Sequence, residues 1–485
     1  MNVLIWYKRD LRVQDHPALA MCAGAAGVLP LYIVEPALWT QPEKSARQWG
    51  FEAETLAGLR EDLGAMGAPL VVRIGEAVEV LARACRQHRI DRIISHVEAG
   101  CAWTTARNHR VAEWANEAGI EWQELPQQSA IESAIGGKAG SLTALPGAEP
   151  GVIPQARALR LADDPCPHRQ IGGRAQGMAL LDSFLARRGQ NYREARDHPH
   201  LAERGSSRLS PYLALGAISG PQVAQAVADF LAIAPDARPD AASAATLETV
   251  PHTDLTAGLK HFLISLRRAA IPGLTAPGLA GTDAMSGVPD FAPQETQFSF
   301  RMSQDHRFAA WADGRTGLPF CDAAMRYLMA TGWLPDKLRG MVFAVAVGPL
   351  GLNPRAAAST LARRFTDYDA RLFWPAVTDI LAGHAARHLA DPVRLGRQLD
   401  ADGRFTRRWL PELALVPDAH LHSPWRCPQA PQTRYPEAIV DLARAQRLTH
   451  RPLPDSDTEV IDRPFARPQS RRFKLAPAGQ LSLDL

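Results

Sequence analysis

The first 125 residues alternate between short apolar runs and segments with helical spacing. The apolar runs have the length and composition of β-strands; they lie at 3–7, 28–34, 70–74, 92–97 and 120–125. Between them, stretches such as 45–66 place apolar residues three and four positions apart, as on one face of a helix. This alternation with short connections predicts a doubly wound parallel sheet, an α/β fold.

The pattern changes after about residue 130, where glycine and proline become dense and predict a linker. Long helical patterns then replace the strands; they lie at 174–189, 211–231, 255–270, 319–333, 336–348 and 356–365. We therefore predict an all-α domain, followed by a polar, Pro- and Arg-rich tail whose composition is typical of disorder. The predicted parts are an α/β domain at 1–130, the linker at 131–173, the helical domain at 174–452 and the tail at 453–485.

Composition excludes several classes of protein. With 46% hydrophobic and 22% charged residues, the chain has the balance of a globular protein, and its net charge of +3 gives no overall attraction to nucleic acid. Six cysteines without a CxxC pair predict reduced thiols, and we expect no zinc or iron–sulfur site. Because no secretory signal and no apolar run of about 20 residues is visible, we expect a cytoplasmic, monomeric protein that does not enter a membrane.

The stretch "GSSRLSPYLALGAIS" (205–219) places several serines at the start of a helical pattern. The first turn of a helix presents unpaired N–H groups and the positive end of the helix dipole, so it favours anions. Pro211 suits such a first turn. Two interpretations remain open from these residues alone: simple helix capping by Ser210, and an anion-binding site.

Together with two other segments, this stretch resembles the DNA photolyase/cryptochrome family. "IWYKRDLRVQDHPAL" (5–19) is similar to the family's opening strand and loop, and "WADGRTGLPFCDAAMRYLMATGW" (311–333) is similar to a block of its helical domain. The resemblance implies FAD in the helical domain and a carbon–carbon lyase that repairs damaged DNA by light-driven electron transfer. It also allows an antenna pigment of unidentified type in the α/β domain.

The resemblance further implies which residues hold the cofactor. Near the FAD pyrophosphate it puts Tyr192, Ser206, Ser207, Leu209 and Ser210. Beside the flavin ring it puts Arg339, Asp367 and Asp369. A buried arginine–carboxylate pair sets the charge near such a ring. A structural ion pair between two helices is the alternative for Arg339 and Asp367.

Other positions depart from the family pattern, so we expect an altered active site. The substrate-facing Glu and Trp align with Ser265 and Arg268, and an arginine does not reproduce a carboxylate's hydrogen bonding. The three electron-carrying tryptophans and the residue facing flavin N5 align with Arg301, Pro354, Val377 and Phe373. Trp374 and Arg268 remain as candidate catalytic residues, with a packed core tryptophan as the alternative for Trp374. A degenerate homologue that binds DNA, or a light sensor, is the alternative function.

The chain ends in "GQLSLDL", which resembles the peptide by which bacterial repair proteins bind the replication sliding clamp. In that interpretation Leu481, Leu483 and Leu485 fill apolar pockets and Gln480 fixes the register. The alternative is an amphipathic end that folds back. Arginine doublets in the helical domain are usually solvated faces, but some are expected to contact DNA phosphates; they lie at 187–188, 267–268, 363–364 and 407–408.

Overall fold

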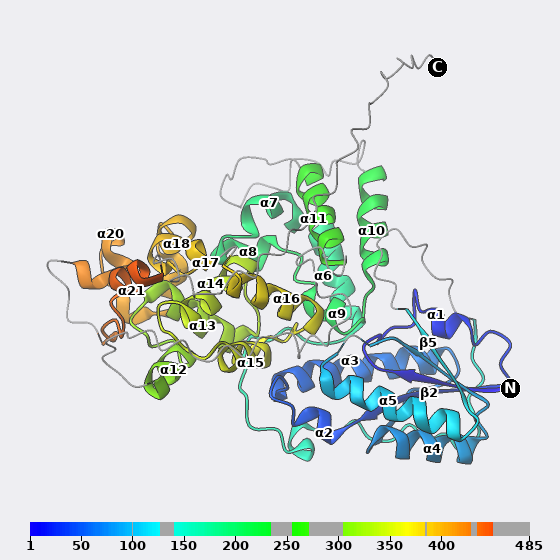
Figure 1. Cartoon of the computed structure of the whole chain (residues 1–485). Coiled ribbons are helices and arrows are strands. Elements are labelled where there is room, and N and C mark those ends of the chain that lie inside the picture. Colours follow the sequence, from blue (N-terminus) through cyan, green and yellow to red (C-terminus); the bar gives the residue numbers. More distant parts are fainter. Residues whose placement is uncertain are drawn as a thin grey trace, which may run out of the picture.

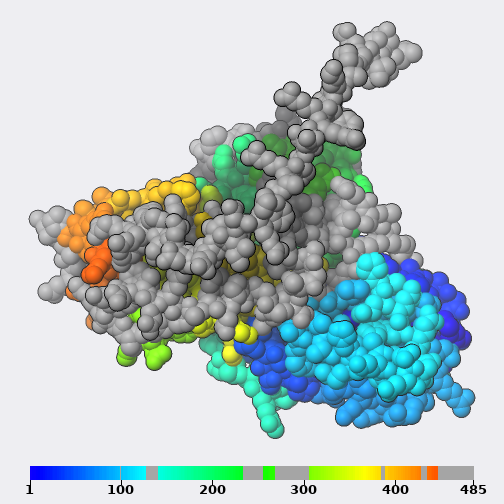
Figure 2. Space-filling model, viewed as in Figure 1, coloured from blue at the N-terminus to red at the C-terminus, as the bar shows by residue number. Residues whose placement is uncertain are grey.

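A computed structural model describes residues 1–98, 100–126, 140–233, 255–270, 304–383, 386–427 and 434–449. An α/β half is followed in the chain by a helical half, and the two halves lie side by side (Figure 1). In the space-filling view the α/β half forms a distinct lobe, coloured blue to cyan (Figure 2). Among the described residues, no helix has both the length and the apolarity that a membrane span requires.

The α/β half contains one parallel sheet, as the sequence predicts. Its strands are β1 (Asn2–Tyr7), β2 (Gly27–Val34), β3 (Val71–Ile74), β4 (Arg92–His96) and β5 (Glu121–Leu125). They are ordered β3-β2-β1-β4-β5, so the direction in which strands are added reverses between β1 and β4. In an open α/β sheet, the carboxyl ends of the strands at such a reversal form the usual ligand crevice.

Helices cover both faces of this sheet. Successive side chains of β1 point to opposite faces and belong to two different cores. Val3 and Ile5 pack with Leu56 of α3 (Ala46–Ala65). Leu4 and Trp6 belong to the core on the other face, together with residues of α4 (Ala77–His88) and α5 (Ala102–Glu117). Two short helices, α1 (Pro17–Ala20) and α2 (Pro36–Trp39), follow β1 and β2.

The helical half begins with helices that share a core with the sheet. These are α6 (Arg174–Ala186), α7 (Tyr192–Ala195), α9 (Ser210–Ala214), α10 (Gly220–Ile233) and α11 (Leu255–Ala270). Between α7 and α9, α8 (Pro199–Gly205) contributes Ala202 to a different core. A second core joins most of the later helices, which are α12 (Gln304–Ala312), α13 (Pro319–Thr331), α14 (Asp336–Val347), α15 (Pro354–Arg364), α16 (Ala370–Leu381), α17 (Ala386–Leu389), α18 (Pro392–Leu399), α19 (Arg404–Trp409), α20 (Asp418–Leu421) and α21 (Leu442–Thr449). Short 3-10 turns lie at Ala156–Leu159, Arg188–Asn191, Pro411–Leu413 and Pro424–Arg426.

One helix prediction is wrong. The helical pattern at 211–231 is two helices, α9 and α10, separated by a turn at 215–219. Gly216 has φ +65°, and a Cβ at this position would lie 2.4 Å from the carbonyl oxygen of Arg9. Because only glycine tolerates both the backbone angle and the close approach, the chain turns here against the α/β half.

Candidate functional site

The serine stretch forms a loop between α8 and α9. Ser206 is extended at the end of α8, and Arg208 has φ +59°, a left-handed conformation that a non-glycine residue adopts at a penalty of about 1–2 kcal/mol. The backbone then enters α9 at Ser210. The sequence prediction of a helix start preceded by serines is therefore confirmed, although α9 is a single short turn rather than a long helix.

Two serine hydroxyls in this loop are buried without a partner in the described part of the chain. The Oγ atoms of Ser206 and Ser210 make no hydrogen bond among the described residues. Ser210 therefore does not cap α9 with its side chain, which removes the simple capping interpretation. Ser207 Oγ accepts a long bond of 3.4 Å from the N–H of Leu209, which is fully buried. Buried polar atoms are nearly always paired, so these orphaned hydroxyls suit a ligand with acceptor oxygens, such as a phosphate.

Arg188 holds this loop through hydrogen bonds to the backbone carbonyl groups of the loop. Its guanidinium donates to the carbonyl oxygens of Ser206 at 2.5 Å, Ser207 at 3.3 Å and Leu180 at 2.6 Å. Gln170 donates to the carbonyl of Arg208 at 2.8 Å and accepts from its Nε at 3.2 Å. The loop is therefore fixed through its carbonyls, while the hydroxyls of Ser206 and Ser210 pair with none of the residues that the structure describes.

Arg339 and Asp367 form a two-pronged ion pair, as the resemblance implies. Nη1 of Arg339 donates to Oδ1 of Asp367 at 3.0 Å and Nη2 donates to Oδ2 at 2.5 Å. Its Nε donates to the carbonyl of Leu334 at 2.8 Å, and the guanidinium lies 4.3 Å from the ring centre of Phe365. Burial alone would lower the pKa of Arg339, but the Asp367 carboxylate outweighs burial and raises it. The arginine is therefore held charged.

The ion pair and the serine loop contact the same short segment, although they are far apart in sequence. Arg208 lies 4.2 Å from the ring centre of Trp333, and Arg339 binds the carbonyl of the next residue, Leu334. The N–H of Thr366 donates to the carbonyl of Gly332 at 2.9 Å, and the Thr366 hydroxyl is a third buried oxygen without a described partner. The fold thus brings the two predicted parts of the site together around residues 332–334.

Asp369 has a structural role that the sequence did not predict. It caps α16 by accepting the N–H of Arg371 at 3.0 Å, and it pairs with the guanidinium of the same residue at 2.7 Å. Burial would raise the pKa of Asp369, but Arg371 overcomes burial and lowers it. Tyr192, the remaining cofactor candidate, is buried and packs edge-on against Phe184 and Phe262.

The candidate catalytic tryptophan lies in a packed aromatic cluster. Trp374 is only 2% exposed, and its Nε1 donates to the Tyr368 hydroxyl at 3.0 Å. Phe373 aligns with the family residue that faces flavin N5. Its ring packs edge-on against both residues, with its centre 5.5 Å from that of Tyr368 and 5.3 Å from that of Trp374. Val377 is a buried core residue of α16, and Pro354 begins α15.

The substrate-side positions are only partly described. Ser265 on α11 accepts from Arg196 at 3.1 Å and donates to the carbonyl of His261 at 3.1 Å. Arg268 lies on the same helix, but its side chain is outside the described part. Arg301, Gln480, Leu481, Leu483 and Leu485 also lie outside the described residues. Of the arginine doublets, Arg188, Arg364 and Arg407 donate to backbone carbonyls, so they are part of the internal framework.

A second buried polar cluster lies at the reversal between β1 and β4, and sequence reasoning missed it. Oδ2 of Asp10 lies 2.8 Å from Nε2 of His16 and 2.5 Å from Nδ1 of His96, and all three residues are buried. Two histidines and a carboxylate are a metal-ligand set, but His16 already accepts the N–H of Leu19 with its Nδ1. Its Nε2 must then carry the proton and donate to Asp10, which favours a hydrogen-bonded network over metal ligation.

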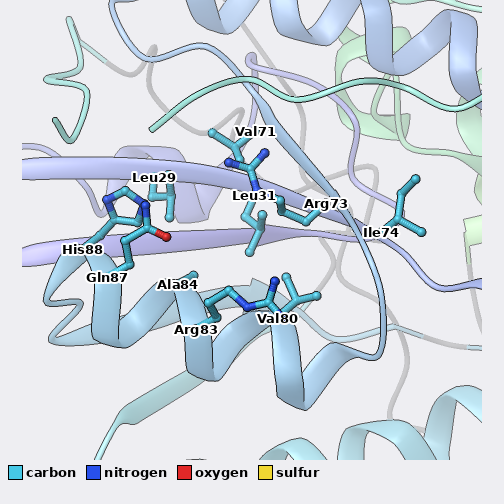
Figure 3. A pocket seen from close by; sticks show the side chains of 10 residues that line it. All are labelled: Leu29, Leu31, Val71, Arg73, Ile74, Val80, Arg83, Ala84, Gln87 and His88. Carbon is cyan, nitrogen blue, oxygen red and sulfur yellow. The ribbon is translucent and has the colours of Figure 1, made fainter. Parts of the chain in front are cut away.

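A small pocket between the sheet and α4 is unrelated to either cluster. Its lining includes Leu29, Leu31, Val71, Arg73, Ile74, Val80, Arg83, Ala84, Gln87 and His88 (Figure 3). Its volume of about 50 Å³ is far below the roughly 300–1,000 Å³ of pockets for organic ligands. It therefore accommodates a few water molecules rather than a cofactor.

Comparison with known proteins agrees with this arrangement. Residues 3–135 match the family model described as DNA photolyase, and residues 282–453 match the model described as the FAD binding domain of DNA photolyase. The chain is 26% identical to a deoxyribodipyrimidine photo-lyase of Vibrio cholerae over 92% of this chain and 98% of the relative. It is also 26% identical to a cryptochrome DASH of Gloeobacter violaceus over 91% of this chain and 93% of the relative.

Solved structures share the fold. A Synechocystis cryptochrome superposes with a TM-score of 0.73 at 20% identity, over 92% of this chain and 98% of that one. An archaeal photolyase from Sulfolobus tokodaii, solved with two FAD molecules, superposes with a TM-score of 0.64 at 22% identity over the same shares. With both family models matched in order, the chain belongs to the DNA photolyase/cryptochrome family and has its FAD-binding domain.

Proposed function

We propose that this protein repairs damaged DNA with FAD and light, in a site altered from the usual photolyase pattern. When bound, FAD supplies the light-driven electron transfer. The protein binds and orients the cofactor: the hydroxyls of Ser206 and Ser210 donate to its pyrophosphate, next to the N-terminus of α9. The observation that carries this assignment is the pair of buried hydroxyls without a described partner.

At the ring end, the proposed role of Arg339 and Asp367 is electrostatic. Their two-pronged geometry fixes a positive charge beside a buried negative one, close to the segment at 332–334. A fixed charge pair in a buried place stabilises a developing charge without reorganising. Asp369 orders the start of α16 in this proposal, and Tyr192 packs at the phosphate end.

The altered part is the side that faces the DNA. Ser265, which aligns with a family carboxylate, is hydrogen-bonded to Arg196, which directly follows α7, and Arg196 also contacts Nε2 of His261. A hydroxyl and a cation here favour contacts with phosphate or base acceptors over the proton donation that a carboxylic acid provides. We therefore propose a lesion preference different from that of the usual enzyme.

The test is spectroscopic and catalytic. Freshly purified protein is expected to show flavin absorbance, and blue light is expected to reverse a dimer in a defined oligonucleotide only when the flavin is reduced. Colourless protein that does not bind added FAD would contradict the assignment of an FAD site. A yellow protein that repairs neither major dimer class would instead favour the light sensor, because a relative with equal identity is named cryptochrome DASH.

An antenna pigment is proposed for the carboxyl edge of the sheet. Three buried polar atoms without a described partner lie at the ends of β1, β2 and β4, namely Tyr7 Oη, Glu35 Oε1 and His96 Nε2. The strand order reverses here, which is the usual ligand position in such sheets. The relative from Sulfolobus tokodaii holds a second FAD described as a light-harvesting cofactor. Mass spectrometry of the molecules released on unfolding, with their amounts per protein chain, tests this. Recovery of one equivalent of FAD and no other pigment would count against it.

Binding to the sliding clamp is proposed from sequence alone. The peptide containing Gln480, Leu481, Leu483 and Leu485 has the spacing of a clamp-binding motif. A pull-down with purified bacterial clamp compares the full chain with a chain ending at Gly479. Equal retention of the two proteins would remove the proposal.

A further inference from the structure

The loop that follows β1 leaves the α/β half and contacts the helical half. The N–H of Leu11 donates to the carbonyl of Leu215 at 3.1 Å, and Nη1 of Arg12 donates to the carbonyl of Gly216 at 3.2 Å. The Ser219 hydroxyl donates to Oδ2 of Asp15 at 2.5 Å. The turn between α9 and α10 is thus docked on this loop, and Figure 1 shows α9 beside the α/β half.

Within the loop, Arg9 contacts two segments of the flavin site at once. Its Nε and Nη2 donate to the carbonyl of Ala214 at 3.1 and 2.8 Å, and Nη2 also donates to the carbonyl of Tyr368 at 3.0 Å. Ala214 is the last residue of α9, the helix that begins at Ser210. Tyr368 stands between Asp367 and Asp369.

The loop that carries Arg9 is itself held firmly. The Asp10 carboxylate accepts the N–H of Lys8 at 2.9 Å and is paired with His16 and His96. Arg12 donates to the carbonyl of Asp15 at 2.8 Å, which closes the loop on itself. A guanidinium on such a loop is a fixed point against which two segments can be positioned.

We propose that Arg9 is a positioning residue of the flavin site, which sets the spacing between its phosphate end and its ring end. The inference rests on the proposed function, because it takes the serine loop and the Asp367 segment as the two ends of one cofactor site. α9 is only five residues long, so a displacement at Ala214 moves Ser210 with it. Because a guanidinium presents several N–H groups in a rigid plane, it can join two carbonyls, whereas an ammonium on a flexible stem fixes neither direction.

The first experiment is hydrogen–deuterium exchange on the protein without FAD, comparing Arg9→Met with wild type. We expect faster exchange in both 209–215 and 367–371. Arg73→Met is the matched control, because Arg73 also donates to two backbone carbonyls, those of Val72 and Glu149, but within the α/β half. Faster exchange in only one of the two segments, or the same change in the control, would overturn the inference.

The second experiment titrates FAD and follows flavin fluorescence. The loss of the two bridging contacts is expected to raise the dissociation constant about tenfold in Arg9→Met and less in Arg9→Lys, with no change in Arg73→Met. If wild type and Arg9→Met bind FAD equally, the bridge has no role in binding. If wild type binds no FAD, the proposed function fails, and the exchange experiment still tests the coupling. If Arg9→Met does not fold, Arg9→Lys provides both measurements.

Discussion

The two buried polar clusters of this protein differ in how their oxygen atoms are paired. At the edge of the sheet, both carboxylate oxygens of Asp10 are occupied, by Lys8 N–H on one side and by His16 and His96 on the other. In the loop between α8 and α9, the hydroxyls of Ser206 and Ser210 are buried with no described partner. A carboxylate satisfied within the fold indicates structure, whereas unsatisfied hydroxyls indicate a place kept for a ligand.

This difference leads to opposite expectations for mutagenesis. If a paired group is replaced, its former partners remain buried and unsatisfied, so the folded state loses stability. If an unpaired hydroxyl is removed, the protein without cofactor loses nothing, and only ligand binding suffers. The four predictions below test this contrast, in order of decreasing expected effect.

Replacement of Asp10 is expected to have the largest effect. Asp10→Asn retains the shape but puts an amide N–H₂ where histidine or backbone N–H groups now donate, so buried donors lose their partner. We expect unfolding to require about 3–5 kcal/mol less, because more than one buried N–H donor loses its acceptor at about 1–3 kcal/mol each. Urea unfolding measures this. Asp313→Asn is the control, since Asp313 pairs with Arg315 at an exposed site, and a similar loss there would contradict the contrast.

Acid is expected to weaken the same cluster through His16. Burial, opposed by Asp10, lowers the pKa of His16 from 6.5 to about 4 in the folded protein. The unfolded chain therefore takes up a proton first as the pH falls. The stabilisation is complete above pH 6.5 and is lost between pH 6.5 and 4, by about 3 kcal/mol in total.

Unfolding at pH 7.5 and pH 5 measures the effect of His16. His16→Asn is the informative variant, because asparagine can also accept the N–H of Leu19 at the helix start but does not titrate. The variant should lose less stability than wild type between the two pH values. An equal loss in both would assign the pH dependence to other groups.

At the ring end, variants of the Arg339–Asp367 pair distinguish an effect on stability from an effect on FAD binding. Arg339→Met leaves Asp367 as a buried carboxylate without its partner, and we expect a loss of about 2–3 kcal/mol. Adding Asp367→Asn should recover part of this stability, because the uncompensated charge is gone. If the pair serves the flavin, the double variant still binds FAD at least tenfold more weakly than wild type. Recovery of wild-type affinity would leave the pair a purely structural role.

Much of the fold could be predicted from the sequence because its signals are local. The five strand predictions agree with the structure to within about two residues, and the helix at Leu255–Ala270 agrees at both ends. The error at 211–231 is instructive: an apolar periodicity continues through Gly216, and only contact with the Arg9 carbonyl explains why the chain turns there. A glycine within a helical pattern is a weak signal by itself.

Sequence reasoning could propose site residues where a motif carries them, but not where distant residues come together. Ser206, Ser210, Arg339 and Asp367 could be proposed as site residues because their segments resemble those of a family. Arg9 and Arg188 were not assigned to the site, because an arginine that binds backbone carbonyls leaves no pattern in the sequence. Arg9 and Tyr368 are 359 positions apart. Arg188 belongs to a doublet that resembles a DNA-binding surface, yet its guanidinium points to the serine loop.

The smallest effect on stability is expected for the serines, and it tests the contrast most directly. Ser206→Ala and Ser210→Ala each remove a buried hydroxyl that has no described partner, so the protein without FAD should keep its unfolding midpoint or gain slightly. Each variant should nevertheless bind FAD about tenfold more weakly, since one bond to a charged phosphate is lost. Ser183→Ala is the control, because its hydroxyl accepts from Arg188 at 2.8 Å and its loss should lower stability first. A serine variant that loses stability but binds FAD normally would mean that the hydroxyls belong to the framework, and the two clusters would then differ only in degree.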